Sequence, residues 1–263
     1  MVRHLGVDVE AFIQPILTKL LFVGVRVSLV VYFLPFFGSG GIAARIKAGL
    51  TVALTALFFS VCTPPPDSLT QVNWLSVLTG ELAVGLALGL SVQFVFEALQ
   101  VAGQLCGLQL GYSLESLIDP QTNAQTPVLS TFYYTVAILI FLQLNVHHWM
   151  LRALRESFEY LPPGKVVLST AMAAELIRAS GLMLSVGVQI AAPITLTALM
   201  IDIALGFIGR AAPQLPVMLV GISVKDLLGI AMVGTTLALW PTRLEGHFAG
   251  AIRTGEHLLR LAH

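Results

Sequence analysis

Long apolar runs, separated by short clusters of glycine, proline and polar residues, dominate the pattern of this chain. The runs cover Phe12 to Phe37, Ala48 to Cys62, Trp74 to Leu110, Val128 to Met150, Ala171 to Phe207, and Val217 to Trp240. Most reach the length of about 18 residues that spans a hydrocarbon core roughly 30 Å thick. Because they lack the alternation of membrane β-strands, they predict an all-α fold of integral membrane-type helices.

Helix-breaking residues separate the apolar runs. They lie at Gly38 to Gly41, Pro64 to Pro66, Asp119 to Pro127, Pro162 to Gly164, and Pro213 to Pro216. No linker is long and no short repeat occurs, so we expect residues 1–263 to form a single domain. If six helices each crossed the membrane once, the distribution of basic residues would place both termini in the cytoplasm.

Composition narrows the function classes. Of the 263 residues, 56% are hydrophobic and only 11% are charged, whereas soluble domains are about 25% charged. The chain has 14 basic and 14 acidic residues, so no net charge attracts it to nucleic acid. Cys62 and Cys106 lie in apolar runs without metal-ligand spacing, and we interpret them as buried thiols. These features argue against a soluble enzyme and a DNA-binding protein.

Charged residues within or beside the apolar runs do not fit an ordinary lipid-facing bundle. They are Arg26, Glu81, Glu97, Glu175, Arg178, Asp202, Lys225 and Asp226. Each costs about 2.5–3.5 kcal/mol at the centre of a bilayer. We therefore expect most of them near helix ends, in pairs, in water or against a protein partner. Glu175 and Arg178 can meet on one helix face, whereas the adjacent Lys225 and Asp226 cannot simply neutralise each other.

The third apolar run carries a polar stripe. Its members are Gln93, Glu97, Gln100 and Gln104, and Gly89, Gly107 and Gly111 extend it. From Gly85 to Gly111 the stripe is about 39 Å long, which exceeds the hydrocarbon thickness. Close helix packing with amides bonded between helices explains the stripe, and so does a polar conduit or a seam between proteins. The pattern leaves these alternatives open.

No catalytic constellation stands out. The adjacent His147 and His148, followed by Trp149, fit a membrane interface at a helix end better than a metal site. Because nucleotide-binding, hydrolase and metalloprotease motifs are absent, we expect no enzyme activity, no cofactor and no metal. An ion-coupled transporter that uses Glu81, Glu97 and Asp202 as relay carboxylates remains an alternative, although no inverted repeat supports it.

Several motifs in chain order identify a family. The first is Gly103-Gln-Leu-Cys-Gly-Leu-Gln-Leu-Gly-Tyr-Ser113, followed by Asp119-Pro120 and Pro127-Val-Leu. Later come Ala192-Pro193, then Asp202-Ile-Ala-Leu-Gly-Phe-Ile-Gly-Arg210 and Ala212-Pro-Gln-Leu-Pro216, with Gly221 and Lys225 beyond. Together they resemble the FliR/SctT family of type III secretion export-gate proteins over nearly the whole chain.

The resemblance implies a non-enzymatic subunit of the flagellar export gate. Members of this family work with FliP and FliQ in a channel for unfolded export substrates, with FlhB and FlhA nearby, in the inner membrane at the flagellar basal body. The fold would consist of bent helical hairpins, with a FliP-like part at about 1–165 and a FliQ-like part at about 166–263. A SctT homologue of a virulence injectisome is the closest alternative, although the Gly-Leu-Gln-Leu-Gly-Tyr-Ser run favours a flagellar protein.

The resemblance also implies roles for individual residues. The family's pore plug would fall on residues 107–125, including Gly107, Gly111, Tyr112, Ser113, Asp119 and Pro120. Contacts to neighbouring subunits would involve Arg210, Pro213, Gln214 and Lys225. A simple surface loop and a simple helix corner are the plainer interpretations of these two segments. The amphipathic tail from Arg243 to His263 matches no family feature, and we expect it to lie on the membrane surface or against a neighbour.

Overall fold

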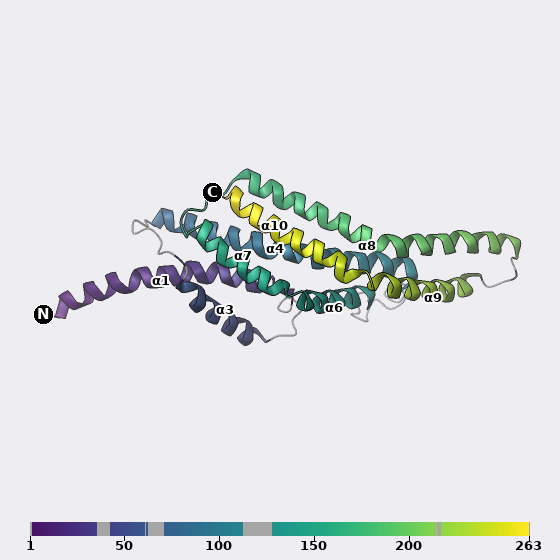
Figure 1. Ribbon diagram of the computed structural model, residues 1–263, viewed down its shortest axis with the longest axis horizontal. Helices are drawn as coiled ribbons and strands as arrows, with labels where there is room; N and C mark the ends of the chain where they lie inside the picture. Colours follow the sequence, from purple (N-terminus) through teal and green to yellow (C-terminus); the bar gives the residue numbers. More distant parts are fainter. Residues whose placement is uncertain are drawn as a thin grey trace. The chain divides into compact units, whose positions relative to one another are not determined.

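The described part of the computed structural model consists of helices and their connections (Figure 1). The structure describes residues 2–35, 43–60, 62, 71–112, 128–212, 214 and 217–262, with the backbone alone for 2–12, 71–73 and 217–219. The helices in these ranges are α1 (Val2–Tyr32), α3 (Ala44–Phe59), α4 (Gln71–Leu110), α6 (Val128–Gln143), α7 (Val146–Tyr160), α8 (Thr170–Ala211), α9 (Val217–Leu237) and α10 (Trp240–Leu261). The predicted all-α fold is therefore confirmed.

The prediction of one helix across Val128 to Met150 is wrong. Asn145 adopts the left-handed conformation, with φ of 55°, and separates α6 from α7. Asparagine reaches this conformation more easily than other residues with a side chain, so a single asparagine between two apolar stretches is enough to break the helix. His147, His148 and Trp149 consequently lie at the start of α7, and not at the end of a helix.

Fewer helices can cross a membrane than the six apolar runs suggested. Four helices within the described ranges are long and apolar enough, in Ile13–Tyr32, Trp74–Leu110, Thr170–Ala211 and Val220–Leu237. The broken pair α6 and α7 adds a fifth if it forms one span. The run from Ala48 to Cys62 belongs to α3, whose 16 residues extend only about 24 Å and fall short of a hydrocarbon core.

The described helices form two compact units, and α4, α8 and α10 contribute residues to both. Unit 1 comprises residues 1–94, 145–179 and 248–263. Within it, a Cβ on Gly85 would lie 2.9 Å from the Cβ of Leu29, and one on Gly89 would lie 2.8 Å from that of Phe33. These equal spacings show that α1 and α4 run parallel to each other in close contact.

Unit 2 comprises residues 95–144 and 180–247. Phe96 packs edge-on against Tyr134 and Phe141, with ring centroids 5.7 and 5.5 Å apart, and so joins α4 to α6. The part of α8 after Pro193 and the antiparallel α9 form a second pair, which we name the α8–α9 hairpin (Figure 1). Its members approach closely at Gly221, where a Cβ would lie 2.8 Å from Leu205.

The C-terminal tail is largely explained by α10. Leu244, Phe248, Leu258 and Leu259 are buried, whereas Arg253 and Arg260 are exposed. In unit 1, the carbonyl of Ala262 accepts a hydrogen bond from the Val167 amide at 2.9 Å, and the carbonyl of Leu261 accepts one from Ser169 Oγ at 2.8 Å. The apolar stripe of the tail therefore packs on this chain itself.

Candidate functional site

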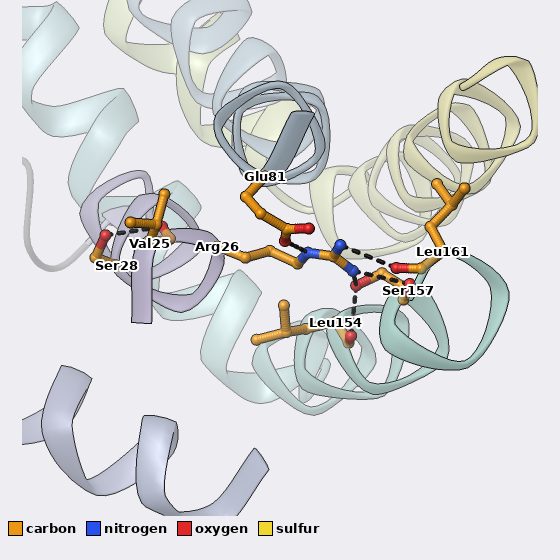
Figure 2. Close-up of polar contacts among 7 residues, drawn as sticks. All are labelled: Val25, Arg26, Ser28, Glu81, Leu154, Ser157 and Leu161. Carbon is orange, nitrogen blue, oxygen red and sulfur yellow. Dashed lines mark hydrogen bonds and ion pairs between the residues drawn. The ribbon is translucent and has the colours of Figure 1, made fainter. Parts of the chain in front are cut away.

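A buried ion pair lies in unit 1, between Arg26 of α1 and Glu81 of α4. Arg26 Nε donates to Glu81 Oε2 at 2.6 Å, and both side chains are fully buried. Figure 2 shows the guanidinium reaching past Glu81 towards the end of α7. The Arg26 guanidinium carbon also lies 4.4 Å from the centre of the Phe158 ring, which adds a cation–π contact. Two of the unfavourable charges in the sequence are thus paired within the chain.

Arg26 also caps the C-terminal end of α7. Its Nη1 donates to the Ser157 carbonyl at 2.9 Å and to Ser157 Oγ at 3.2 Å, and its Nη2 donates to the Leu161 carbonyl at 2.9 Å. The last carbonyls of a helix lack helical donors and carry partial negative charge, so a cation is favourable there. Glu81 Oε1 has no hydrogen-bond partner in the described structure, so the carboxylate is satisfied on one side only. This cluster ties α1, α4 and α7 together.

The four polar residues of the predicted stripe lie on α4. Gln93, Glu97 and Gln100 are half-buried, and Gln104 is exposed. Where α6 crosses near this stripe, Ser130 Oγ donates to the Gln100 carbonyl at 3.1 Å, and a Cβ on Gly103 would lie 2.5 Å from the Ser130 Cα. Small residues therefore allow the backbones of α4 and α6 to touch, while the amide and carboxylate side chains of the stripe remain partly accessible.

The end of α4 leads into the predicted plug. Gly107 is buried in the helix, and Gly111 ends it with φ of 92°, a conformation that favours glycine. The Tyr112 amide donates to the Gly107 carbonyl at 3.0 Å, which closes the last turn. Ser113, Asp119 and Pro120 of the predicted plug lie outside the described residues.

Two residues of α9 hold the end of α4 within unit 2. Asp226 lies near the Tyr112 side chain: burial raises the pKa of Tyr112, and the charge and hydrogen bond of Asp226 raise it further. One turn away, a Cβ on Gly229 would overlap the end of the Leu110 side chain, so a larger residue at this position would force the leucine to move. Sequence reasoning flagged Asp226 as a misplaced charge but missed Gly229 and the contact with Tyr112. No local spacing connects residues so far apart in the chain.

The structure describes three of the four predicted interface residues. Arg210 at the end of α8 and Gln214 in the following turn are both exposed, and Pro213 lies outside the described residues. Lys225 instead bonds within unit 2, where its Nζ lies 2.5 Å from Asp202 Oδ1. This pair joins the two helices of the α8–α9 hairpin and explains how Lys225 is neutralised without its neighbour Asp226.

The expected pairing of Glu175 with Arg178 is confirmed. Arg178 Nη1 lies 3.7 Å from Glu175 Oε2 at a spacing of three residues. The arginine side chain is 73% exposed, so this pair contributes little to folding stability. Charge in the first turns of α8 is therefore partly compensated, but it remains on the surface of this chain.

The comparisons with known proteins agree with the motifs. Residues 17–251 match the family of bacterial export proteins, family 1. A flagellar biosynthetic protein FliR of Pectobacterium carotovorum is 36% identical over 229 residues, which cover 86% of each chain. The FliR of Bacillus subtilis is 30% identical over 244 residues, covering 92% of this chain and 94% of its own, and the FliR of Escherichia coli is 30% identical over 219 residues, covering 81% and 82%. The chain therefore belongs to the family of membrane-embedded bacterial export proteins that includes these FliR flagellar biosynthetic proteins.

Proposed function

We propose that this chain is a non-enzymatic subunit of the flagellar type III export gate in the bacterial inner membrane. In this proposal it forms, with FliP and FliQ, the channel for unfolded export substrates at the flagellar basal body, with FlhB and FlhA nearby. Family membership supports the flagellar assignment, because the relatives from Pectobacterium, Bacillus and Escherichia are all named flagellar biosynthetic proteins. This favours a flagellar protein over an injectisome SctT homologue.

The observation that carries the subunit role is the open surface of the α8–α9 hairpin. Leu199, Ile203 and Phe207 of α8 and Leu227 of α9 are exposed, although they are large and apolar. The same helices carry Asp202, which is 43% exposed, and the exposed Arg210. Water disfavours the apolar side chains and lipid disfavours the charges. Neighbouring protein subunits, with polar groups placed to match, can accept both.

The gating role falls on the segment that follows α4. We infer that residues 107–125 plug the pore and that the contact of Tyr112 with Asp226 anchors the start of this plug to α9. Gly111 supports a hinge at this point, since its left-handed conformation already turns the chain out of the helix. A gate held by one hydrogen bond and a leucine contact can open at a cost of a few kcal/mol.

The two-part organisation remains a proposal as well. It assigns about 1–165 to a FliP-like part and about 166–263 to a FliQ-like part, with Arg210, Pro213, Gln214 and Lys225 near contacts to neighbouring subunits. The exposure of Arg210 and Gln214 in this chain supports such contacts. We expect Arg210→Ala to reduce co-purification with FliP and FliQ. Unchanged co-purification would remove Arg210 from the interface.

The ion-coupled transporter receives less support. A relay carboxylate must exchange protons with a water-filled path. Glu81, one of its three candidates, is fully buried and is held by Arg26. Asp202, another, is bonded to Lys225. The export-gate proposal needs no proton exchange at either position.

Deletion of residues 113–118 tests the plug. The complex of this chain with FliP and FliQ is reconstituted in planar bilayers, and its ionic conductance is measured without substrate. We expect the deletion to open a steady conductance while the yield of assembled complex stays unchanged. Tyr112→Phe, which removes only the hydroxyl, should increase brief openings, whereas Tyr32→Phe at an exposed position of α1 should not. A closed channel in the deletion variant would overturn the plug.

A further inference from the structure

A cavity in unit 2 combines an apolar floor with two basic side chains. Its volume is about 180 Å³, and it lies between the middle of α8 and the junction of α9 with α10. Ile190, Pro193 and Trp240 supply apolar walls, and Arg243 and His247 stand one helical turn apart on α10. None of the nine residues that line it in the described part of the chain is acidic. We propose that this cavity binds an anionic phospholipid, with the phosphate at Arg243 and His247 and the start of an acyl chain along Ile190 and Trp240.

The position of the cavity along the chain favours a lipid. The apolar stretch Val220–Leu237 of α9 ends three residues before Trp240, and Arg243 follows Trp240 within one turn. Tryptophan and basic residues gather where a membrane-spanning helix meets the headgroup layer. A phospholipid places its phosphate and the top of its acyl chains at this same depth. The cavity therefore offers an apolar surface where the acyl chains begin and a cationic surface where the phosphate lies.

The chemistry of the lining fits a phosphodiester. Arg243 is exposed and can offer a fork of N–H donors to phosphate oxygens, while Trp240 of the same cavity is only 6% exposed. Burial lowers the pKa of His247, and the charge of Arg243 lowers it further. A neutral imidazole still donates one N–H, and an approaching phosphate favours its protonation.

Pro193 of α8 leaves one helix carbonyl beside the cavity without its usual donor. Pro193 has no N–H, so the usual helix hydrogen bond from position 193 to the Gln189 carbonyl cannot form. Gln189 also lines the cavity. A headgroup that carries hydroxyls, such as glycerol, can donate to this carbonyl. The size of the cavity exceeds the roughly 150 Å³ of engineered apolar cavities that hold benzene, so it can take the upper part of an acyl chain.

Photolabelling in native membranes tests this proposal, which does not depend on the export function. Membranes containing the full chain with its partner subunits are exposed to phosphatidylglycerol with a diazirine near the top of one acyl chain, and the labelled peptides are identified by mass spectrometry. We expect labels in residues 188–194 and 236–247. Photoreactive phosphatidylcholine should label these peptides about tenfold less, because its headgroup has no net negative charge.

Substitutions in the cavity and competition by unlabelled lipid test whether the label comes from the cavity. The double variant Arg243→Gln with His247→Gln should be labelled about tenfold less than the wild-type protein. Arg253→Gln, which changes an exposed arginine of the same helix, should be labelled to the same extent as the wild type. For the wild-type protein, unlabelled phosphatidylglycerol should compete and excess glycerol 3-phosphate should not. Equal labelling by the two lipids, loss of label to glycerol 3-phosphate, or an unchanged double variant would overturn the proposal. Capture of a partner subunit by a photocrosslinker at Ile190 would overturn it too.

Discussion

α4 and α8 are equally hydropathic, yet their surroundings in this chain differ sharply. In the most apolar stretch of α4, 61% of the residues are buried, against 17% in α8 and 17% in α9. α4 is surrounded by helices of its own chain, including α1 in unit 1 and α6 in unit 2. The α8–α9 hairpin leaves most of its apolar residues uncovered. Helices of equal hydropathy therefore differ in burial: α4 is packed within its own chain, whereas α8 leaves most of its apolar residues open to lipid or to partner subunits.

The surroundings of the glycines also differ between α4 and α8. A Cβ on Gly85, Gly89 or Gly103 of α4 would lie within 3 Å of another segment of the chain. In α8, Gly187 is also close-packed, since its Cβ would lie 2.8 Å from the Ala98 carbonyl oxygen of α4, but Gly181 and Gly206 have nothing within 4 Å. Glycine costs about 1 kcal/mol relative to alanine in a helix, so it persists where something requires it. In α4 that requirement is visible as close packing. No contact within the described chain requires glycine at Gly181 or Gly206 of α8, and we expect a partner to approach these two positions.

The largest expected effect concerns the closed region, in which α1, α4 and α7 surround the buried pair of Arg26 and Glu81. Glu81→Ala leaves the buried Arg26 without its carboxylate, so we expect a loss of about 3–5 kcal/mol in the free energy of unfolding. Denaturant titration of the purified chain or complex in mild detergent measures this loss. Arg26→Met combined with Glu81→Leu removes both charges and keeps apolar volume, so it should recover much of the stability.

An exposed pair on the same unit provides the control. Arg155 and Glu159 lie 3.2 Å apart with side chains 64% and 52% exposed. Glu159→Ala should change the free energy of unfolding by less than about 0.5 kcal/mol, because water screens such pairs. Equal losses for Glu81→Ala and Glu159→Ala would contradict the view that α1, α4 and α7 form a closed region around a buried charge pair.

The second effect concerns the contact of α4 with α6. In Gly103→Ala, the new methyl group would meet the backbone of Ser130 at 2.5 Å and the Leu129 carbonyl at 3.0 Å. Because backbone cannot rotate away, the helices must separate, and we expect a loss of about 1–3 kcal/mol. The same titration measures this loss. An unchanged stability would mean that α6 is not held against α4 at this point.

Sequence reasoning recovered what depends on local pattern. The run from Trp74 to Leu110 matches α4 closely, since apolar periodicity and the closing glycine are local signals. The pairing of Glu175 with Arg178 followed from helix geometry in the same way. The stripe and the plug residues could be placed on or after this helix, but their role in a channel depends on molecules that this chain does not contain.

Contacts over long sequence distances could not be predicted. Arg26 and Glu81 are 55 residues apart, and nothing in either segment indicates that α1 lies parallel to α4. The charges were recognised as costly, but an internal pair and an external partner explained them equally well. The break at Asn145 escaped for a different reason: one polar residue within an apolar run is a weak signal unless its backbone conformation is known.

A smaller effect, a gain in stability, is expected in α8 and tests its comparison with α4. Gly206→Ala introduces a methyl group into open space on an exposed helix face, so we expect the unassembled chain to gain up to about 1 kcal/mol. Thermal unfolding in detergent measures this gain. Co-purification with FliP and FliQ should fall in the same variant, because a partner that approaches this glycine closely would meet the new methyl. A gain in stability with unchanged assembly would indicate that lipid, and not protein, covers Gly206.

The smallest effect in the isolated chain is expected for Asp202→Asn. The pair with Lys225 joins the α8–α9 hairpin, but its carboxylate side is 43% exposed, so its loss should cost no more than about 1 kcal/mol before assembly. Within the gate, a partner that covers the hairpin would remove water from Lys225, and the unpaired charge would then become costly. We therefore expect Asp202→Asn to reduce the yield of assembled complex more than the stability of the chain, as measured by co-purification and denaturant titration of the same preparation. Combining it with Lys225→Met, which removes the orphaned charge, should restore assembly. If the single and double variants assembled equally well, the hairpin would remain in contact with water in the complex. The claim that a partner subunit covers the α8–α9 hairpin would then be wrong.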